Sequence, residues 1–328
     1  MSGAPLVDYT ATSLRPDWSG LPQALRDALV VALGSEIAEA GPPVSSGFTG
    51  GFAGPLKLAD GRRVFVKASD DTLHPYRAYQ REAEVVPQLP PDIHVPAIVA
   101  TAHATDGERK WFAVVSEWVG GRMPGVPWTA DDFALVTATC ERIAEVMDPS
   151  PLDGLHTFIS DLEEGESPLL VPAQIMAGER PLPTGLQPWT RDVLPELADL
   201  VQLAPEAFAG NAATHGDLRP DNLLIDDAGT CWTVDWNWLA LGPPWMDWVG
   251  LLPVAQHHGI DTAAAIRSSP LTADVPSDHL DCFAAVVAAY MLKNADQPPP
   301  LGCTQAVREH QRFLAWTFLD WLAVRRGW

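Results

Sequence analysis

The chain has 328 residues, of which 47% are hydrophobic and 19% are charged, so it has the composition of an ordinary globular protein. This length is sufficient for one large core or for two lobes. The 42 acidic and 21 basic residues give a formal net charge of −21, which argues against nucleic acids and anionic membranes as main partners.

The N-terminus and the cysteines indicate where the protein works. Residues 1–8 lack the basic and apolar regions of a signal peptide, and no apolar run approaches the length of a membrane span. The four cysteines are widely spaced, form no CxxC pair and are expected to be free thiols. We therefore expect a cytoplasmic protein.

The first predicted elements are a helix followed by strands. Leucines and alanines recur at helical spacing over residues 21–40, and Gly41-Pro42-Pro43 ends the pattern. Strands are predicted between residues 44 and 68, with a glycine-bearing turn at residues 45–52. Small residues in such a turn allow backbone amides to approach a phosphate closely, although an ordinary turn is the alternative. Further along, Asp60-Gly61 predicts a type I′ hairpin turn.

Lys67 and Glu82 stand out in the N-terminal third. Lys67 ends an apolar strand and is one of only four lysines in the chain. A lysine in such a place is costly unless it is paired, or unless it reaches water. A helix is predicted over residues 74–89, and Glu82 points with the apolar face that Tyr79 and Val86 mark. An exposed helix carboxylate is the alternative interpretation of Glu82.

The remaining elements are predicted mainly from hydrophobic spacing. Two strands over residues 97–104 and 110–118 lead into a Gly-Gly segment, and a helix follows over residues 130–147. Residues 149–188 are the least patterned part and contain an acidic cluster at residues 161–166, which is either a solvated loop or a site for a polyamine. Further helices are predicted over residues 189–208, with an interruption near Pro195, and over residues 260–328.

The stretch from His215 to Asp235 carries the candidate chemistry. His215 and Gly216 turn the chain, and Asp217 lies on the loop that Asn222 closes. Two short strands with a turn between them are predicted to bring Asp235 back beside Asn222. The oxygen atoms of Asn222 and Asp235 suit Mg²⁺, while Asp217 is free to orient a hydroxyl group and to accept its proton. An acidic hairpin loop without catalytic function is the alternative.

His215-Gly216-Asp217, followed by four residues and Asn222, resembles the catalytic loop of the aminoglycoside phosphotransferase family, the small-molecule kinases of the protein-kinase-like fold. Val234-Asp235-Trp236 resembles the metal-binding aspartate motif of that family. The resemblance implies an α+β, two-lobed fold, with a small antiparallel β-sheet lobe and a mostly helical lobe. The implied boundaries are residues 1–116 for the nucleotide-binding lobe, 117–121 for the hinge, and 122–328 for the C-terminal lobe with the catalytic loop and the acceptor site.

The resemblance also implies roles for individual residues. Asp217 would be the catalytic base, and Asn222 and Asp235 would hold Mg²⁺. Arg219 would stabilise the transferred phosphoryl group or pair with a carboxylate, and both readings stay open. Asp247 would brace the catalytic loop. The residues implied in nucleotide binding are Lys67, Glu82, Ser46, Phe48, Thr49, Gly50, Glu117 and Val119.

The expected function is therefore an ATP-dependent transfer of the γ-phosphoryl group to a hydroxyl of a small molecule, with GTP open as an alternative donor. Aminoglycosides, other antibiotics and amino sugars are the leading acceptors, and resistance to an antibiotic is the corresponding role. A pseudoenzyme of the same fold and a kinase of a choline-like metabolite are alternatives. A protein kinase is disfavoured because no long activation segment follows Asp235. The net charge is compatible with a cationic acceptor, and monomer and homodimer both stay open.

Overall fold

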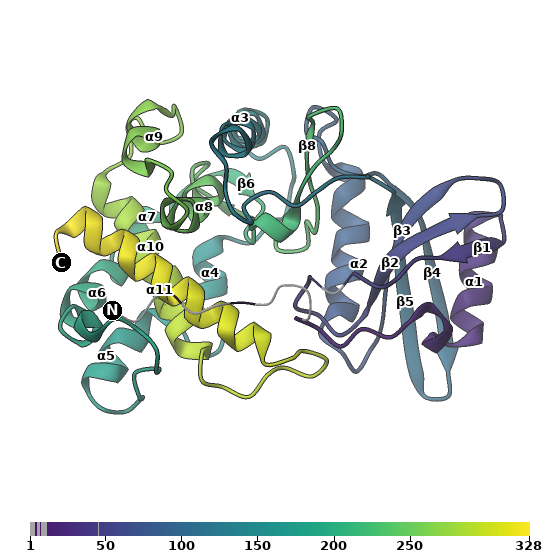
Figure 1. Cartoon of the computed structure of the whole chain (residues 1–328), viewed down its shortest axis with the longest axis horizontal. Coiled ribbons are helices and arrows are strands. Elements are labelled where there is room, and N and C mark those ends of the chain that lie inside the picture. Colours follow the sequence, from purple (N-terminus) through teal and green to yellow (C-terminus); the bar gives the residue numbers. More distant parts are fainter. Residues whose placement is uncertain (1–3, 5–6, 8–11, 45) are drawn as a thin grey trace.

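The structure is a computed structural model that describes residues 4, 7, 12–44 and 46–328 (Figure 1). Most of residues 1–8, and Ser45 in the predicted glycine-bearing turn, lie outside the described residues. One lobe is built on a five-stranded sheet, and the other is mostly helical. In Figure 1 the sheet lobe lies at the right and the helical lobe at the left. The predicted two-lobed α+β fold is thus confirmed.

The sheet of the N-terminal lobe is antiparallel, with strand order β1-β2-β3-β5-β4. Because successive side chains alternate between the two faces, Val64 and Val66 of β3 face one side and Lys67 faces the other. The strands are β1 (Ile37–Ala40), β2 (Phe52–Leu58), β3 (Arg63–Asp70), β4 (Ile98–Asp106) and β5 (Arg109–Glu117).

A helix covers each face of this sheet. On one face, α1 (Gln23–Leu33) buries Leu25 and Leu29 against the face that carries Val64 and Val66. On the other face, α2 (Pro75–Val85) buries Tyr79 against side chains of β5. Lys67 is therefore on the same side of the sheet as α2, which carries Glu82.

Two local predictions for this lobe were wrong. The predicted helix over residues 21–40 ends at Leu33, because Gly34 adopts the left-handed conformation (φ 64°) that terminates helices, and β1 then begins at Ile37. The turn at Asp60-Gly61 is not of type I′, because Gly61 has a positive φ (91°) and Asp60 does not. The Gly61 N–H donates to the Leu58 carbonyl at 3.0 Å, which gives a three-residue loop with glycine in the left-handed position.

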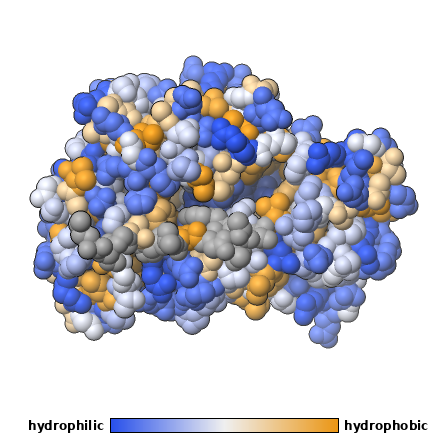
Figure 2. All heavy atoms as spheres, viewed as in Figure 1, coloured by the Kyte–Doolittle hydropathy of each residue, from blue (hydrophilic) through white to orange (hydrophobic). Residues whose placement is uncertain are grey.

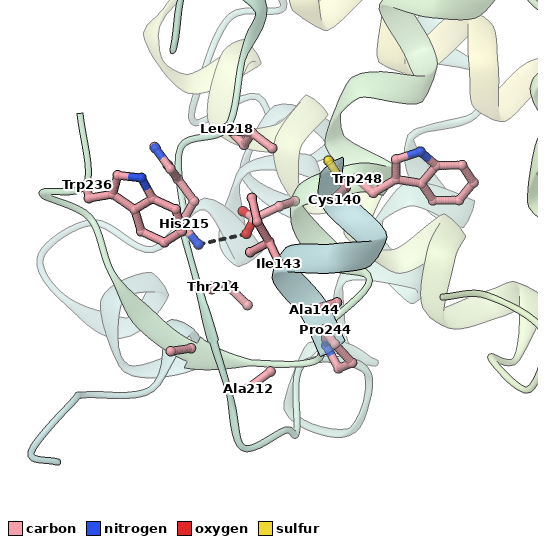
Figure 3. A pocket seen from close by; sticks show the side chains of 12 residues that line it. Cys140, Ile143, Ala144, Ala212, Thr214, His215, Leu218, Trp236, Pro244 and Trp248 are labelled. Carbon is pink, nitrogen blue, oxygen red and sulfur yellow. Dashed lines mark hydrogen bonds between the residues drawn. The ribbon is translucent and has the colours of Figure 1, made fainter. Parts of the chain in front are cut away.

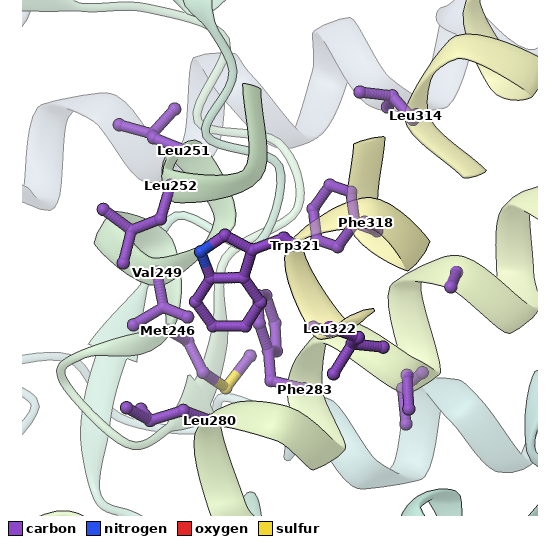
Figure 4. Packing of buried hydrophobic residues seen from close by; sticks show 14 of the residues in the cluster. Met246, Val249, Leu251, Leu252, Leu280, Phe283, Leu314, Phe318, Trp321 and Leu322 are labelled. Atoms are coloured by element: carbon purple, nitrogen blue, oxygen red, sulfur yellow. The ribbon is translucent and has the colours of Figure 1, made fainter. Parts of the chain in front are cut away.

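The C-terminal lobe is organised around α8, α10 and α11. Trp321 is completely buried among Met246, Phe283 and Leu322, and it donates from Nε1 to the Thr262 hydroxyl at 3.2 Å (Figure 4). The helices of the lobe are α3 (Ala130–Met147), α4 (Phe158–Glu163), α5 (Val171–Met176), α6 (Leu194–Val201), α7 (Ala204–Ala207), α8 (Met246–His257), α9 (Thr262–Ser268), α10 (Ser277–Asn294) and α11 (Ala306–Arg326).

Prolines divide the predicted helix over residues 189–208. Pro195 stands in the first turn of α6 and Pro205 in the first turn of α7, positions where a missing N–H is tolerated. The lobe also has two short antiparallel pairs that flank the predicted catalytic loop of residues 215–222. One joins β6 (Ala212–Thr214) to β9 (Ala240–Gly242), and the other joins β7 (Leu223–Ile225) to β8 (Cys231–Thr233).

The surface is largely hydrophilic over both lobes, and a hollow lies where the lobes meet (Figure 2). Within the part of the chain that the structure describes, no helix has the length and apolar character needed to cross a membrane.

Candidate active site

The catalytic loop is held from below by Asp247 in the first turn of α8. Its carboxylate accepts hydrogen bonds from the backbone N–H of His215 (2.7 Å) and of Gly216 (3.0 Å), so the contact expected of Asp247 is present. Gly216 has a φ of 79°, and a Cβ atom there would lie 2.3 Å from the Trp238 carbonyl oxygen. Only glycine fits at this position, so the backbone of the loop depends on Gly216 for its conformation.

His215 orients the loop from a buried position. Its Nδ1 accepts from the Asp217 N–H at 3.3 Å, so Nε2 carries the proton and donates to the Val234 carbonyl at 2.9 Å. Burial lowers the pKa of His215, which keeps the ring neutral. Figure 3 shows the ring beside Trp236, at the edge of a cavity of about 10 Å³. Such a cavity holds one water at most, so it belongs to the packing of the loop.

Asp217 lies at the tip of the loop with 30% of its side chain exposed. Burial, together with the nearby carboxylates of Asp221, Asp235 and Asp247, raises its pKa to about 7, although the Arg219 guanidinium 3.0 Å away acts in the opposite direction. A carboxylate with such a pKa can take up a proton near neutral pH, as a general base must.

Arg219 pairs with carboxylates, which is one of the two roles that the sequence left open for it. Its Nε and Nη2 donate to the two carboxylate oxygens of Asp221, both at 3.1 Å, and its Nη1 donates to Asp217. The guanidinium also lies over the Phe48 ring, 5.2 Å from its centroid. The guanidinium is thus fixed beside the candidate base by two carboxylates and one aromatic ring.

Lys67 joins the two lobes. Its Nζ lies 2.8 Å from both carboxylate oxygens of Glu82 and 2.8 Å from Oδ1 of Asp235. Burial acts to lower the pKa of Lys67, but the two carboxylates outweigh it and the pKa is raised. Burial alone would raise the pKa of Asp235, yet Lys67 holds it below its usual value. Lys67 and Asp235 are therefore both charged at neutral pH.

Asn222 and Asp235 lie side by side, as the returning strand predicts. The Val234 N–H donates to the Asn222 carbonyl at 3.0 Å, and the Asn222 amide nitrogen donates to the Asp217 carbonyl at 2.8 Å. Asp235 has a φ of 70°, rare for a residue other than glycine, and Oδ1 accepts from Asn237 Nδ2 at 2.8 Å. Backbone strain of this kind gathers at functional sites.

This arrangement fits a magnesium site. With their nitrogen and Oδ1 atoms engaged as above, Asn222 and Asp235 still offer oxygen atoms, which are the ligands that Mg²⁺ prefers. Among residues 4, 7, 12–44 and 46–328, no group of three or more His, Cys, Asp or Glu side chains could hold a metal ion. One carboxylate and one amide are sufficient for Mg²⁺ when water and phosphate oxygens complete its shell.

The glycine-bearing turn reaches across to the C-terminal lobe. The Phe48 ring lies 4.5 Å from the His310 ring, and its carbonyl accepts from the Cys303 thiol at 3.0 Å. Gly50 approaches Gly302 so closely that a Cβ on Gly50 would lie 2.6 Å from the Gly302 Cα. The turn therefore lies over Arg219 and the catalytic loop.

Other contacts of the turn distinguish its residues. The Thr49 hydroxyl lies 3.3 Å from the hydroxyl of Tyr79 on α2, while Ser46 forms no side-chain hydrogen bond to the catalytic loop among the described residues. Thr12 donates to the Gly47 carbonyl and Arg15 to the Gly51 carbonyl, both at 2.8 Å. Thr12 and Arg15 could not be predicted from the sequence, since no local pattern marks an N-terminal segment that packs on a distant turn.

The predicted hinge follows β5. Glu117 pairs with Val64 in the sheet, whereas Lys67 pairs with Val114, so Glu117 lies three residues, or about 10 Å, along the strand from the lysine. The structure does not bring Glu117 or Val119 into contact with the Lys67 cluster. After the hinge, Arg122 forms backbone hydrogen bonds with Ile225 of β7 (3.0 and 2.9 Å), which ties the segment to the catalytic loop.

A sheet lobe with a buried Lys–Glu pair, placed over a helical lobe with an Asp-Asn loop and a second aspartate, is the architecture of a kinase-like protein. The model of the phosphotransferase enzyme family (APH) matches residues 55–275. Because this match spans most of the chain, the protein belongs to that family.

Solved structures of low sequence identity share the fold. A thermostable mutant of aminoglycoside phosphotransferase APH(4)-Ia, in its apo form, has a TM-score of 0.60 and 13% identity, over 92% of this chain and 99% of that one. A point mutant of aminoglycoside 2′-phosphotransferase-IIIa bound to GDP has a TM-score of 0.60 and 15% identity, over 89% and 92%. An aminoglycoside phosphotransferase from Alicyclobacillus acidocaldarius has a TM-score of 0.51 and 15% identity, over 94% and 96%. A comparison with curated proteins gave no match.

Proposed function

We propose that this protein transfers the γ-phosphoryl group of ATP to a hydroxyl group of a small molecule. The observation that carries the proposal is the cluster of Lys67, Glu82 and Asp235 at the junction of the lobes, because it places a phosphate-binding lysine directly beside the loop of Asp217 and Asn222. GTP is the alternative donor. In support of a nucleotide substrate, the similar structures include complexes with GDP, ADP and AMP-PNP.

In the proposed reaction, Asp217 orients the acceptor hydroxyl and takes its proton. The acceptor oxygen forms a bond to the γ-phosphorus, the bond from that phosphorus to the bridging oxygen of the β-phosphate breaks, and ADP leaves. Lys67, fixed by Glu82, holds the nucleotide phosphates, and Arg219 stabilises charge on the transferred group. Asn222 and Asp235 would hold Mg²⁺, which neutralises phosphate charge when it is bound.

The two lobes divide this work in the proposal. Residues 1–116 bind the nucleotide, with the turn of Ser46, Phe48, Thr49 and Gly50 covering the phosphates. Residues 117–121 form the hinge, where the Glu117 carbonyl and the Val119 amide contact the purine, and residues 122–328 supply the catalytic loop and the acceptor site. All four cysteines are free, as expected in the cytoplasm, where we place the reaction.

The proposed acceptors are aminoglycosides, other antibiotics or amino sugars, and an antibiotic acceptor would make the protein a resistance factor. Similar structures contain hygromycin B and, for amicoumacin kinase, amicoumacin. A regulator that binds nucleotide without turnover is the second candidate. It is disfavoured because Lys67, Asp217, Asn222 and Asp235 are all present and correctly grouped, whereas a pseudoenzyme has usually lost one of them.

The test is ADP release from Mg-ATP across a panel of aminoglycosides, amino sugars, macrolides, nucleoside antibiotics and choline. We expect release that depends on the acceptor and is absent from Asp217→Ala. Nucleotide binding by the wild-type protein without turnover of any acceptor would instead favour the regulator.

A further inference from the structure

A groove near the catalytic loop lies between the two lobes, between α2 and the segment of α4. Its volume is about 940 Å³, which is within the range of sites for drug-sized ligands. Side chains of both lobes line it, and the two walls carry charges of opposite sign. The groove contains residues that the proposed function has not used.

The N-terminal wall is basic. Arg77 and Arg81 lie one turn apart on α2, and Lys110 of β5 lines the same wall. In the described part of the chain, none of these three forms a salt bridge, although acidic residues outnumber basic ones two to one in this protein. The wall has one carboxylate, Asp71, which accepts from the Lys110 backbone N–H at 3.2 Å. The wall thus carries two more positive charges than negative ones.

The C-terminal wall is acidic. Asp161 of α4 and Glu164, directly after this helix, line it together with His156. The His156 Nε2 lies 2.9 Å from the Asp161 carboxylate, and Glu164 forms no salt bridge among the described residues. Both carboxylates belong to the acidic cluster of residues 161–166, for which the sequence left open a solvated loop or a site for a polyamine.

The groove ends beside the catalytic residues. Trp238 lies in its lining with 47% of its surface exposed, and its ring stacks on the ring of His74, with 5.8 Å between centroids and 16° between planes. Its neighbour Asn237 also lines the groove and donates to Asp235 at 2.8 Å. The Trp238 carbonyl lies against Gly216, next to Asp217. A ligand on this aromatic surface therefore lies near Asp235 and the backbone of Gly216.

Exposed charges on helices are commonly only solvated, but two features distinguish this pair of walls. Arg77 and Arg81 are like charges at i and i+4, an arrangement that destabilises a helix unless an anion lies between them. The opposite walls would attract each other, yet a groove of ligand size separates them. An acceptor with one anionic and one cationic group can form ion pairs with both walls at once.

We propose that this groove is the acceptor site and that the acceptor is a zwitterion: a hydroxylated compound whose carboxylate pairs with Arg77 and Arg81 and whose ammonium group pairs with Asp161 and Glu164. This inference rests on the proposed phosphotransfer. It narrows the acceptors, because a polycationic aminoglycoside would place ammonium groups against the basic wall, where like charges repel.

Binding to the wild-type protein provides a test that does not depend on turnover. Isothermal titration would compare four sugars that share the glucose ring and differ in charge. Glucose has no charge, glucosamine has an ammonium group, glucuronic acid has a carboxylate, and muramic acid has both groups. We expect muramic acid to bind at least about tenfold more tightly than each of the others, and more tightly than kanamycin. A singly charged sugar that binds as tightly as muramic acid, tighter binding of kanamycin, or no binding of any sugar overturns the inference.

Charge variants assign the two walls. Arg77→Gln/Arg81→Gln should reduce binding of muramic acid to the level of glucosamine and leave glucosamine unchanged, whereas Glu164→Gln should reduce it toward the level of glucuronic acid. The matched control is Arg191→Gln/Arg267→Gln, which removes two exposed arginines of the other lobe that lie outside the groove. If the control lowers binding as much as the α2 variant, overall charge and not the groove is responsible, and the inference fails.

Turnover separates this inference from the proposed function. If muramic acid binds in the expected order and stimulates ADP release, both stand. If it binds in that order but ADP release is absent with every acceptor, the zwitterion site stands and phosphotransfer fails. If kanamycin stimulates ADP release more than muramic acid, phosphotransfer stands and the zwitterionic acceptor is wrong.

Discussion

At the scale of single residues, Asp217 is controlled by opposing influences on its pKa. Burial raises this pKa to about 7, and Arg219 acts to lower it. Because the base must be ionised, kcat/KM should rise with pH until the pH passes about 7 and then level off. Arg219→Gln should move the rising part of the pH–rate profile to higher pH, because the guanidinium that lowers the pKa of Asp217 is lost. A pH–rate profile of both proteins is the measurement, and a flat wild-type profile through neutral pH would contradict the assignment of the base.

The ionised carboxylate of Asp217 should also lower the free energy of unfolding at high pH. Its pKa in the folded state lies above the ordinary aspartate value of 3.8, so the associated stability is fully present below that value and is lost as the pH rises through about 7. Asp217→Asn removes the charge, and the variant should be more stable than wild type at pH about 8, by roughly 1 kcal/mol after allowance for the 30% exposure of the side chain.

Urea unfolding at pH about 8 and about 4 measures this difference, which should nearly vanish at the lower pH. The same variant should lose at least about a thousandfold in kcat. A variant that loses both activity and stability at high pH would indicate that Asp217 has a structural role.

At the scale of elements, Lys67 connects β3 to α2 and to the strand-end residue Asp235. Lys67→Met leaves the Glu82 carboxylate buried without its partner, so we expect a loss of about 3 kcal/mol in the free energy of unfolding. Glu82→Gln should cost less, because Lys67 keeps its contact with Asp235. Denaturant unfolding of both single variants and of the double variant measures the coupling, and strict additivity would show that the pair does not act as a unit.

The glycine-bearing turn is attached to the helical lobe chiefly through Phe48. Phe48→Ala removes the ring that contacts Arg219 and His310, so the amides of residues 46–51 should exchange faster with solvent, and nucleotide should both bind and dissociate faster. Hydrogen exchange and stopped-flow binding are the measurements. Leu301→Ala, a control in the neighbouring loop where the side chain is 77% exposed, should change neither. Unchanged exchange in Phe48→Ala would show that the backbone contacts of the turn suffice to close it.

At the scale of the whole molecule, the net charge of −21 produces self-repulsion that salt can screen. We therefore expect the melting temperature to rise between about 20 mM and about 200 mM NaCl at pH about 8. The buried pairs at the lobe junction are screened less than surface charges, so they should not reverse the trend. Calorimetry at several salt concentrations tests this, and a melting temperature that falls with salt would show that surface ion pairs dominate instead.

Several parts of the molecule could be predicted from local sequence because their causes are local. The loop from His215 to Asn222 and the returning strand to Asp235 follow from turn residues and apolar runs a few positions apart, and the structure has this course. The side of α2 on which Glu82 lies follows from helical spacing, and Glu82 is buried there. The helix boundary at Leu33 and the turn at Asp60 were missed because one left-handed glycine decides each, and hydrophobic spacing does not register backbone conformation.

The amino-acid sequence by itself determined the residue types of the site and most of the local elements, since hydrophobic spacing and turn chemistry act over short distances. The two-lobed fold was predicted from the resemblance that the motifs between His215 and Asp235 bear to a known family. Only the tertiary structure decided which distant residues meet. Lys67 reaches Asp235 across 168 positions, and Phe48 lies over Arg219. The opposed charges of α2 and α4 likewise face each other only once the lobes are assembled. Contacts of this kind depend on how whole elements pack against one another, and no local sequence pattern predicts that packing.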